Sequence, residues 1–231
     1  MVRSEPVIIA VAGPVGSGKT TVAETLSEMM GYLYLPESQA ALQYLPDRFQ
    51  CPERWSFESQ IAFIAFRAAD IQQALRDGCS MIADRTIDEN IEVFARYYYE
   101  VGCIDQRAFR TYRTVANFIL NALPSPALVI YCDCSLPLSE SRLRDRDAGL
   151  EPVCSSEFVT CTHTLYGRWV SSYERSPVLH LDTEIVDVRR PELVEIVADE
   201  LRSHLGAAPD AAEQNHPLGY GEDRLLRRAR G

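Results

Sequence analysis

The sequence contains no apolar run that approaches the roughly 20 residues needed to span a bilayer. Its first residues, MVRSEP, do not form the pattern of a signal peptide. We therefore expect a cytoplasmic protein with no membrane partner.

Paired cysteines are also missing. No two cysteines form a CxxC pair, and their total, seven, is odd, so the sequence indicates neither a disulfide framework nor a zinc site. Cys132 and Cys134 would share one face of a strand, which leaves a metal site as the alternative to buried, reduced thiols.

Basic residues are outnumbered: 23 lysines and arginines stand against 33 aspartates and glutamates, a formal net charge of −10. Since phosphate backbones are bound by basic surfaces, we expect no nucleic-acid partner and favour a small acceptor molecule.

The 231 residues, 46% of them hydrophobic, suffice for one α/β catalytic domain, which we place at residues 1–205. Residues 206–231 are rich in Ala, Gly, Pro and charge, and we expect a flexible tail there, whose arginines either contact an anionic partner or remain solvated.

The segment AVAGPVGSGKTTVAETL, residues 10–26, predicts a strand, a glycine-rich turn and a helix. It fits the phosphate-loop pattern G-x-x-x-x-G-K-[ST] in full, in the strand-to-helix context that the mechanism requires. Glycines let backbone N–H groups converge on an anion, and the helix N-terminus adds partial positive charge. The alternative is a glycine-rich turn that binds nothing. The residues predicted to bind ATP here are Gly13, Gly16, Ser17, Gly18, Lys19 and Thr20, with Lys19 on the β and γ phosphates and Thr20 on Mg²⁺.

Strand and helix patterns alternate along the chain, which predicts a three-layer α/β P-loop kinase fold: a five-stranded parallel sheet flanked by helices, with an arginine-rich lid. A long helix is expected over residues 52–75 and two helices, separated near Gly102, over residues 88–123. Ligands of such sheets lie beyond the carboxyl ends of the strands. The predicted strands are Val7–Ala12, Tyr32–Leu35, Met81–Ala83, Leu128–Asp133 and Val178–Leu181.

Charged side chains follow three of these strands. Glu37 could accept a proton from an attacking hydroxyl, or simply open a surface loop. Asp84 suits the outer shell of Mg²⁺ and Arg85 could hold a substrate oxygen, although an ordinary salt bridge is the alternative. Beyond the fourth strand, the segment SRLRDRDAGLE favours a lid closing over phosphates, or a solvated charged helix.

The order of the phosphate loop, Pro-Glu, PERWSFESQ, Asp-Arg-Thr and the arginine-rich segment resembles the deoxynucleoside kinase family, which includes deoxycytidine, deoxyguanosine and bacterial deoxyadenosine kinases. The resemblance covers about residues 6 to 205, and PERWSFESQ is its most specific part. It implies a homodimer formed through helices between Asp88 and Leu123. It also implies that Glu37 is the general base, that Arg85 lies beside the acceptor 5′-hydroxyl, that Arg142 and Arg146 bind phosphates, and that Phe49, Trp55, Phe57, Gln60, Arg67, Asn90 and Glu151 bind the nucleoside.

Within that set, the resemblance implies that Gln60 and Arg67 meet the base and that Glu151 meets the sugar 3′-hydroxyl. Three positions depart from the family pattern. Phe49 stands where a tyrosine usually contacts the 3′-hydroxyl, Asn90 stands where many members have an aspartate, and Ala148 replaces a further lid arginine. The departures at Phe49 and Asn90 affect the acceptor pocket and leave the identity of the nucleoside open, a modified one included.

We therefore expect ATP-dependent, Mg²⁺-assisted phosphorylation of a (deoxy)nucleoside at its 5′-hydroxyl, with a weak preference for purine deoxynucleosides. The first alternative is a nucleoside monophosphate or other small-metabolite kinase on the same scaffold. It would need a cationic clamp for the acceptor phosphate, and the long helix from Phe57 onward offers only Arg67 and Arg76. The second is a nucleotide-binding regulatory protein without turnover, which would be expected to lose Lys19, Glu37 or Arg85.

Overall fold

The computed structural model describes residues 5–146, 154–186 and 192–205. Five parallel strands form one sheet in the order β2-β3-β1-β4-β5. The five-stranded parallel sheet predicted from the sequence is confirmed, and each strand lies within one residue of its predicted bounds at both ends. The strands are β1 (Ile8–Ala12), β2 (Leu33–Leu35), β3 (Met81–Asp84), β4 (Leu128–Asp133) and β5 (Val178–Asp182).

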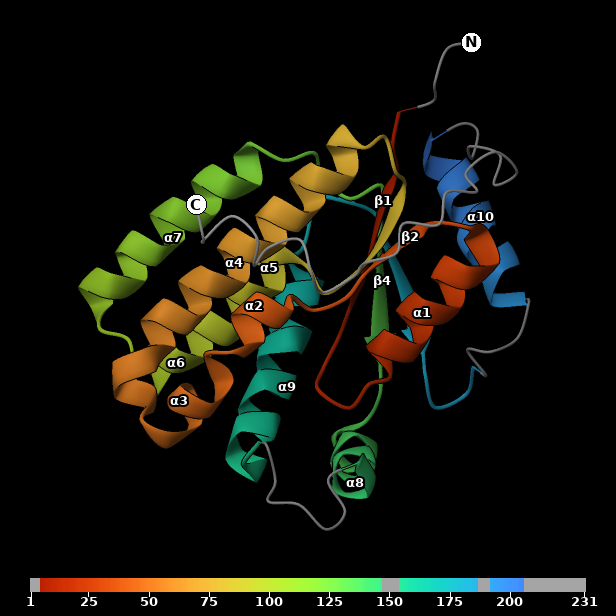
Figure 1. Ribbon diagram of the computed structural model, residues 1–231. Coiled ribbons are helices and arrows are strands. Elements are labelled where there is room, and N and C mark those ends of the chain that lie inside the picture. Colours follow the sequence, from red (N-terminus) through yellow and green to blue (C-terminus); the bar gives the residue numbers. More distant parts are fainter. Residues whose placement is uncertain (1–4, 147–153, 187–191, 206–231) are drawn as a thin grey trace.

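Helices cover both faces of the sheet. Figure 1 shows α1 and α10 on one side and α4, α7 and α9 on the other, which gives the three layers expected. The predicted tail, residues 206–231, lies outside the described residues. The helices are α1 (Lys19–Met30), α2 (Gln39–Leu42), α3 (Leu45–Gln50), α4 (Pro52–Arg76), α5 (Ile87–Glu89), the π-helix η1 (Asn90–Ala95), α6 (Arg96–Glu100), α7 (Gln106–Asn121), α8 (Leu136–Arg146), α9 (Ser156–Ser171) and α10 (Glu192–Leu205).

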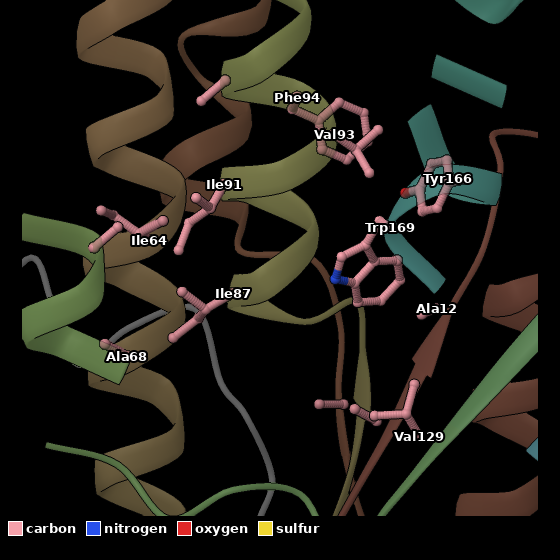
Figure 2. Close-up of a cluster of buried hydrophobic side chains, with 14 of the residues drawn as sticks. Ala12, Ile64, Ala68, Ile87, Ile91, Val93, Phe94, Val129, Tyr166 and Trp169 are labelled. Carbon is pink, nitrogen blue, oxygen red and sulfur yellow. The ribbon is translucent and has the colours of Figure 1, made fainter. Parts of the chain in front are cut away.

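Alternate residues of the central strand β1 serve the two halves of the core. Ile9 and Val11 pack with buried residues of α1 and α10, whereas Ile8, Ala10 and Ala12 belong to a larger cluster with α4, η1, α7 and α9. Figure 2 shows part of this larger cluster. In it, Ile64 of α4 and Ile91 of η1 lie between their two helices, while Phe94, Tyr166 and Trp169 fill the space toward α9. The packing fixes α4, η1 and α9 against the sheet, and these are the elements that carry much of the site.

The Tyr97-Tyr98-Tyr99 triplet packs in this core. Tyr98 is buried, the Tyr99 ring stacks on Phe109 with centroids 4.5 Å apart, and Tyr97 meets Phe158 edge-on at 4.9 Å. The helical segment then ends before Gly102, whose φ of 82° reverses the chain ahead of α7.

Strand order determines where a ligand can bind. The chain runs from β1 to β2 and β3 on one side, and then to β4 and β5 on the other, so the order reverses around β1. Val11 pairs with Asp84, and the Arg85 amide donates to the Val11 carbonyl at 2.9 Å. The segments after β1 and β3 therefore leave the sheet side by side, and α8 lies beyond the carboxyl end of β4 (Figure 1). None of the helices in the described part of the chain is long and apolar enough to cross a membrane.

Candidate active site

The phosphate loop between β1 and α1 is packed too closely for side chains at two of its glycines. A Cβ on Gly13, whose φ is 142°, would lie 2.4 Å from the Cys132 carbonyl oxygen. A Cβ on Gly16, at φ 85°, would lie 2.7 Å from the Ser139 carbonyl oxygen of α8. The loop can take this shape only with glycine at both positions.

The N-terminus of α1 is open to an anion. Its N-cap residue, Gly18, is left-handed, no side chain caps the helix, and the first turn contains no acidic residue. The first amide N–H groups of a helix have no partner inside it and carry partial positive charge. The loop and the helix end therefore fit the phosphates of a nucleotide.

Lys19 begins this helix and is 6% exposed. Its Nζ donates to the Pro14 carbonyl at 2.7 Å, which folds the side chain back over the loop. Burial, helped by the nearby Arg85 cation, lowers the pKa of Lys19 from 10.5 to about 8. A bound phosphate would restore the preference of this amine for the charged form.

Two oxygen groups meet next to the loop. Thr20 Oγ1 donates to Asp84 Oδ2 at 2.7 Å, and the Tyr34 hydroxyl lies 3.5 Å from the same carboxylate oxygen. Mg²⁺ is held by few protein oxygens and completes its shell with phosphates and waters. The hydroxyl and carboxylate of Thr20 and Asp84 are donors of the right kind, so the site fits this metal ion.

Glu37 and Arg85 form an ion pair at the mouth of the site. Glu37 follows β2, Arg85 follows β3, and Arg85 Nε lies 3.2 Å from Glu37 Oε1. Within the described ranges, Arg85 is the only residue other than glycine with a positive φ, 80°. Such strained backbone occurs mainly where a function requires it. Burial opposes the charge of Arg85, but the Glu37 and Glu89 carboxylates hold its pKa well above the ordinary value.

Tyr166 and Glu89 contact Arg85 on the side away from Glu37. The sequence motifs predicted neither residue. Arg85 Nη1 donates to the Tyr166 hydroxyl at 3.0 Å, and this hydroxyl donates to Glu89 Oε1 at 2.7 Å. Thr86 and Glu89 form a capping box, in which the Thr86 amide donates to Glu89 Oε2 at 2.6 Å. Burial raises the pKa of Glu89, and the Arg85 cation opposes that shift. The spacing Thr86-x-x-Glu89 is the capping-box signature, which could have revealed this carboxylate.

A cavity of about 160 Å³ opens beside the Glu37–Arg85 pair. Phe63, Phe94 and Phe158 supply apolar walls, and Arg48 adds a charge that the motifs did not predict. The residues of the predicted site that line this cavity are Glu37, Phe49, Gln60, Arg85, Asn90 and Arg146.

Three residues predicted to bind the nucleoside do not line the cavity. Arg67 is buried and donates to the carbonyls of Asp84 at 2.6 Å and Leu35 at 3.3 Å, so it ties the ends of β2 and β3 together. With these contacts Arg67 does not line the cavity, and its contact with the base stays a prediction. Trp55 packs on Tyr44, with centroids 6.3 Å apart, and Phe57 packs against the larger core cluster.

The arginines of α8 stand at alternate positions, so they point in different directions around the helix. Arg142 donates to the carbonyl of Thr183 at 2.8 Å and to that of Gly16, in the phosphate loop, at 3.4 Å. Arg146 reaches the cavity, and Arg144 is exposed. Glu151 and Ala148, the other predicted lid positions, lie outside the described residues.

Comparison with known proteins decides the family. A family model described as deoxynucleoside kinase matches residues 9–205. The chain belongs to this family. It is 31% identical to the deoxyadenosine/deoxycytidine kinase of Bacillus subtilis over 199 residues, which cover 85% of this chain and 92% of the relative. It is 29% identical to the deoxyadenosine kinase of Dictyostelium discoideum, over 84% of this chain and 79% of that one.

A solved structure leads to the same family. The deoxyadenosine kinase of M. mycoides, solved with bound dATP, superimposes with a TM-score of 0.71 at 25% identity, covering 85% of this chain and 100% of that one. The family, the α/β P-loop kinase fold and the assignment as a phosphotransferase that phosphorylates nucleosides, all predicted from the motifs, are confirmed.

Proposed function

We propose that this deoxynucleoside kinase transfers the γ-phosphoryl group of ATP to the 5′-hydroxyl of a purine deoxynucleoside. The observation that carries the proposal is the Glu37–Arg85 pair, which lines the cavity at the carboxyl ends of β2 and β3, beside the phosphate loop. A carboxylate and a guanidinium there can deprotonate and orient one hydroxyl, while the loop holds the donor. The relatives act by name on deoxyadenosine, deoxyguanosine and deoxycytidine, which supports the substrate class.

Each group has a distinct role in the transfer. Glu37 accepts the proton of the 5′-hydroxyl as its oxygen attacks the γ-phosphorus, and the bond to the departing diphosphate breaks. Arg85 holds the attacking oxygen, and Lys19 and the loop amides stabilise the negative charge on the phosphates. Thr20 and Asp84 would hold Mg²⁺, which neutralises phosphate charge when bound. Arg142, which donates to the Gly16 carbonyl, and Arg146, which lines the cavity, would bind the phosphates.

The nucleoside would bind in the cavity, among Phe49, Gln60 and Asn90, with Glu151 on the sugar. A purified-enzyme assay tests this with ATP, Mg²⁺ and the full set of natural nucleosides and deoxynucleosides, together with their 5′-monophosphates. We expect one or more deoxynucleosides to yield the 5′-monophosphate. Faster turnover of a monophosphate acceptor would favour the alternative kinase class, and no turnover with any acceptor would favour the regulatory protein.

We also propose a homodimer formed through the helices between Asp88 and Leu123, of which α7 is the longest, together with the neighbouring α4 (Figure 1). Their exposed apolar side chains include Phe66, Val115 and Phe118, and Phe118 is 76% exposed. Light scattering should give the mass of a dimer, and Phe118→Glu should give that of a monomer. Ile185→Glu, at an exposed apolar residue outside these helices, is the matched control and should leave the mass unchanged.

We further propose that the enzyme is cytoplasmic and acts on a small molecule. Because its net charge is −10, we expect no nucleic-acid or membrane partner. A filter-binding measurement with duplex DNA and a vesicle co-sedimentation measurement test the two expected absences of binding.

A further inference from the structure

Arg48, in α3, is a buried cation with almost no protein partner. Arg48 is 6% exposed and lines the cavity. Among the described residues its side chain makes one hydrogen bond, a long one of 3.4 Å from Nη1 to Ser59 Oγ, while its Nε is buried with none. No carboxylate in the described ranges lies within 4.0 Å of its guanidinium nitrogens. An unpaired buried charge destabilises a fold, so stability alone does not account for this residue.

Two aromatic rings hold the guanidinium in place. Its Cζ lies 5.1 Å from the centroid of the Phe49 ring and 5.2 Å from that of Tyr98. Contacts of this kind orient the planar group through its face and leave the N–H donors at its edge unused. Apart from the long Nη1 contact with Ser59, the donors of Arg48 are therefore available to a molecule in the cavity.

Two side-chain amides also line the cavity, together with the charged side chains of Glu37, Arg85 and Arg146. Gln60 is 1% exposed, and its Oε1 is buried with no hydrogen-bond partner. Asn90 lines the same cavity, and its amide brings one acceptor and two donors with no charge. The cavity thus combines a group that only donates with amides that both donate and accept.

We propose that Arg48 reads the base of the nucleoside and selects guanine. The inference rests on the proposed function and names the base within it. Guanine presents two neighbouring acceptors, O6 and N7, which match the fork of an arginine, and it also carries N–H donors for the amides of Gln60 and Asn90. Adenine presents an amino donor beside N7, so the donors of Arg48 would face a donor and remain unpaired.

Base preference tests the proposal directly. We expect kcat/KM to be higher for deoxyguanosine than for deoxyadenosine or deoxycytidine, by about ten- to hundredfold over deoxyadenosine. Deoxyinosine keeps O6 and N7 and should remain a good substrate, whereas 7-deaza-deoxyguanosine lacks the N7 acceptor and should be a poor one. Arg48→Met should remove the preference, because it should lower kcat/KM for deoxyguanosine and leave kcat/KM for deoxyadenosine nearly unchanged.

Two further variants separate charge, shape and folding. Arg48→Lys keeps the charge but loses the planar fork, so it should recover only part of the preference. Arg54→Met, at an exposed arginine paired with Glu58 in α4, is the matched control and should retain the full preference. The melting temperature of Arg48→Met should not fall, because the change removes an unpaired buried charge.

The outcomes distinguish this proposal from the proposed function. Calorimetric binding of deoxyguanosine and deoxyadenosine is measured beside turnover. Turnover of deoxyadenosine or deoxycytidine above that of deoxyguanosine would overturn the base assignment and leave the kinase function standing. An equal loss for all nucleosides in Arg48→Met, with a lower melting temperature, would assign Arg48 a structural role. Absence of turnover with a retained preference for binding deoxyguanosine would contradict the proposed function alone.

Discussion

The Tyr166 hydroxyl donates to Glu89 Oε1 at 2.7 Å across 77 residues of sequence. The same hydroxyl accepts from Arg85 Nη1 at 3.0 Å, so the strained Arg85 is held from behind by a phenol and a buried carboxylate. Its Nε remains directed at Glu37. We therefore expect Glu89 and Tyr166 to be positioning residues, which would act on the acceptor hydroxyl through Arg85.

Glu89→Gln should lower kcat with the nucleoside by about ten- to hundredfold, because a hydrogen bond to a charged group contributes about 1.5–3 kcal/mol. Tyr166→Phe should cost less, since it removes only a neutral hydroxyl from the chain of contacts. The KM for ATP should stay near the wild-type value in both variants, because the phosphate loop is untouched. Steady-state kinetics with each substrate varied in turn measures kcat and the KM for ATP separately. A drop in melting temperature with wild-type kcat would reduce Glu89 to a folding role.

Glu37→Gln should reduce turnover by about 10² to 10⁴, the usual contribution of a general base. The amide keeps the size of the side chain and can still accept a hydrogen bond from Arg85, so the nucleoside should bind with nearly unchanged affinity. Rapid-quench turnover and calorimetric binding check the two halves separately. Unaltered turnover at saturating substrate would remove Glu37 from the mechanism.

Lys19 is the only lysine in the sequence. Protein labelled with isotopic lysine should therefore give one side-chain NMR signal, whose titration reports this amine alone. We expect a midpoint near the lowered pKa of about 8, instead of the ordinary 10.5. Addition of a non-hydrolysable ATP analogue should move the midpoint upward, because phosphate favours the charged amine. A midpoint near 10.5 in the free protein would contradict the burial seen in the structure.

The same pKa predicts how stability depends on pH. Between pH 8 and 10.5 the unfolded chain binds more protons at Lys19 than the folded chain does, so this residue makes the free energy of unfolding rise with pH. Below pH 8 the cost of the buried charge is fully present. Lys19→Met should therefore be more stable than wild type at pH 7, and the difference should shrink toward pH 10. Urea unfolding at several pH values measures it, and a difference independent of pH would refute the assignment.

The strands and the phosphate loop could be predicted because their signals are local. A strand buried on both faces appears as a continuous apolar run, as in Val7–Ala12, and the loop needs glycine wherever a Cβ would collide with backbone, as at Gly13. Motif order then indicated the family, and with it the neighbourhood of Glu37 and Arg85. These features depend on short segments, whose patterns predict the same local structure whatever the rest of the chain.

The parts of the site that were not predicted depend on contacts distant in sequence. Arg48 lies in LPDRFQ, a segment with the composition of a solvated turn, and only packing against Tyr98 and the cavity shows that it is buried. Arg67 shares a helix face with Gln60, but its long side chain reaches backbone carbonyls at the ends of β2 and β3. The capping-box spacing is a local signal for Glu89, whereas no local sequence pattern indicates its contact with Tyr166.

Phe49 predicts how strictly the enzyme recognises the sugar. It lines the cavity with a ring that lacks the hydroxyl of the tyrosine usual at this position in the family. In the proposed binding mode the 3′-hydroxyl would therefore lose one partner. A neutral hydrogen bond contributes about 0.5–1.5 kcal/mol. We therefore expect weak discrimination against 3′-deoxy analogues in the wild type, and an improvement of no more than about tenfold for ordinary deoxynucleosides in Phe49→Tyr.

The measurement compares kcat/KM for a deoxynucleoside and its 3′-deoxy counterpart in wild type, Phe49→Tyr and Glu151→Ala. Phe49→Tyr should widen the gap between the two substrates, and Glu151→Ala should narrow it, because each variant changes one partner of the same hydroxyl. If the wild type already rejects the 3′-deoxy compound by more than about a thousandfold, roughly 4 kcal/mol, then another group must read that hydroxyl. In that case the sugar would lie elsewhere in the cavity than beside Phe49.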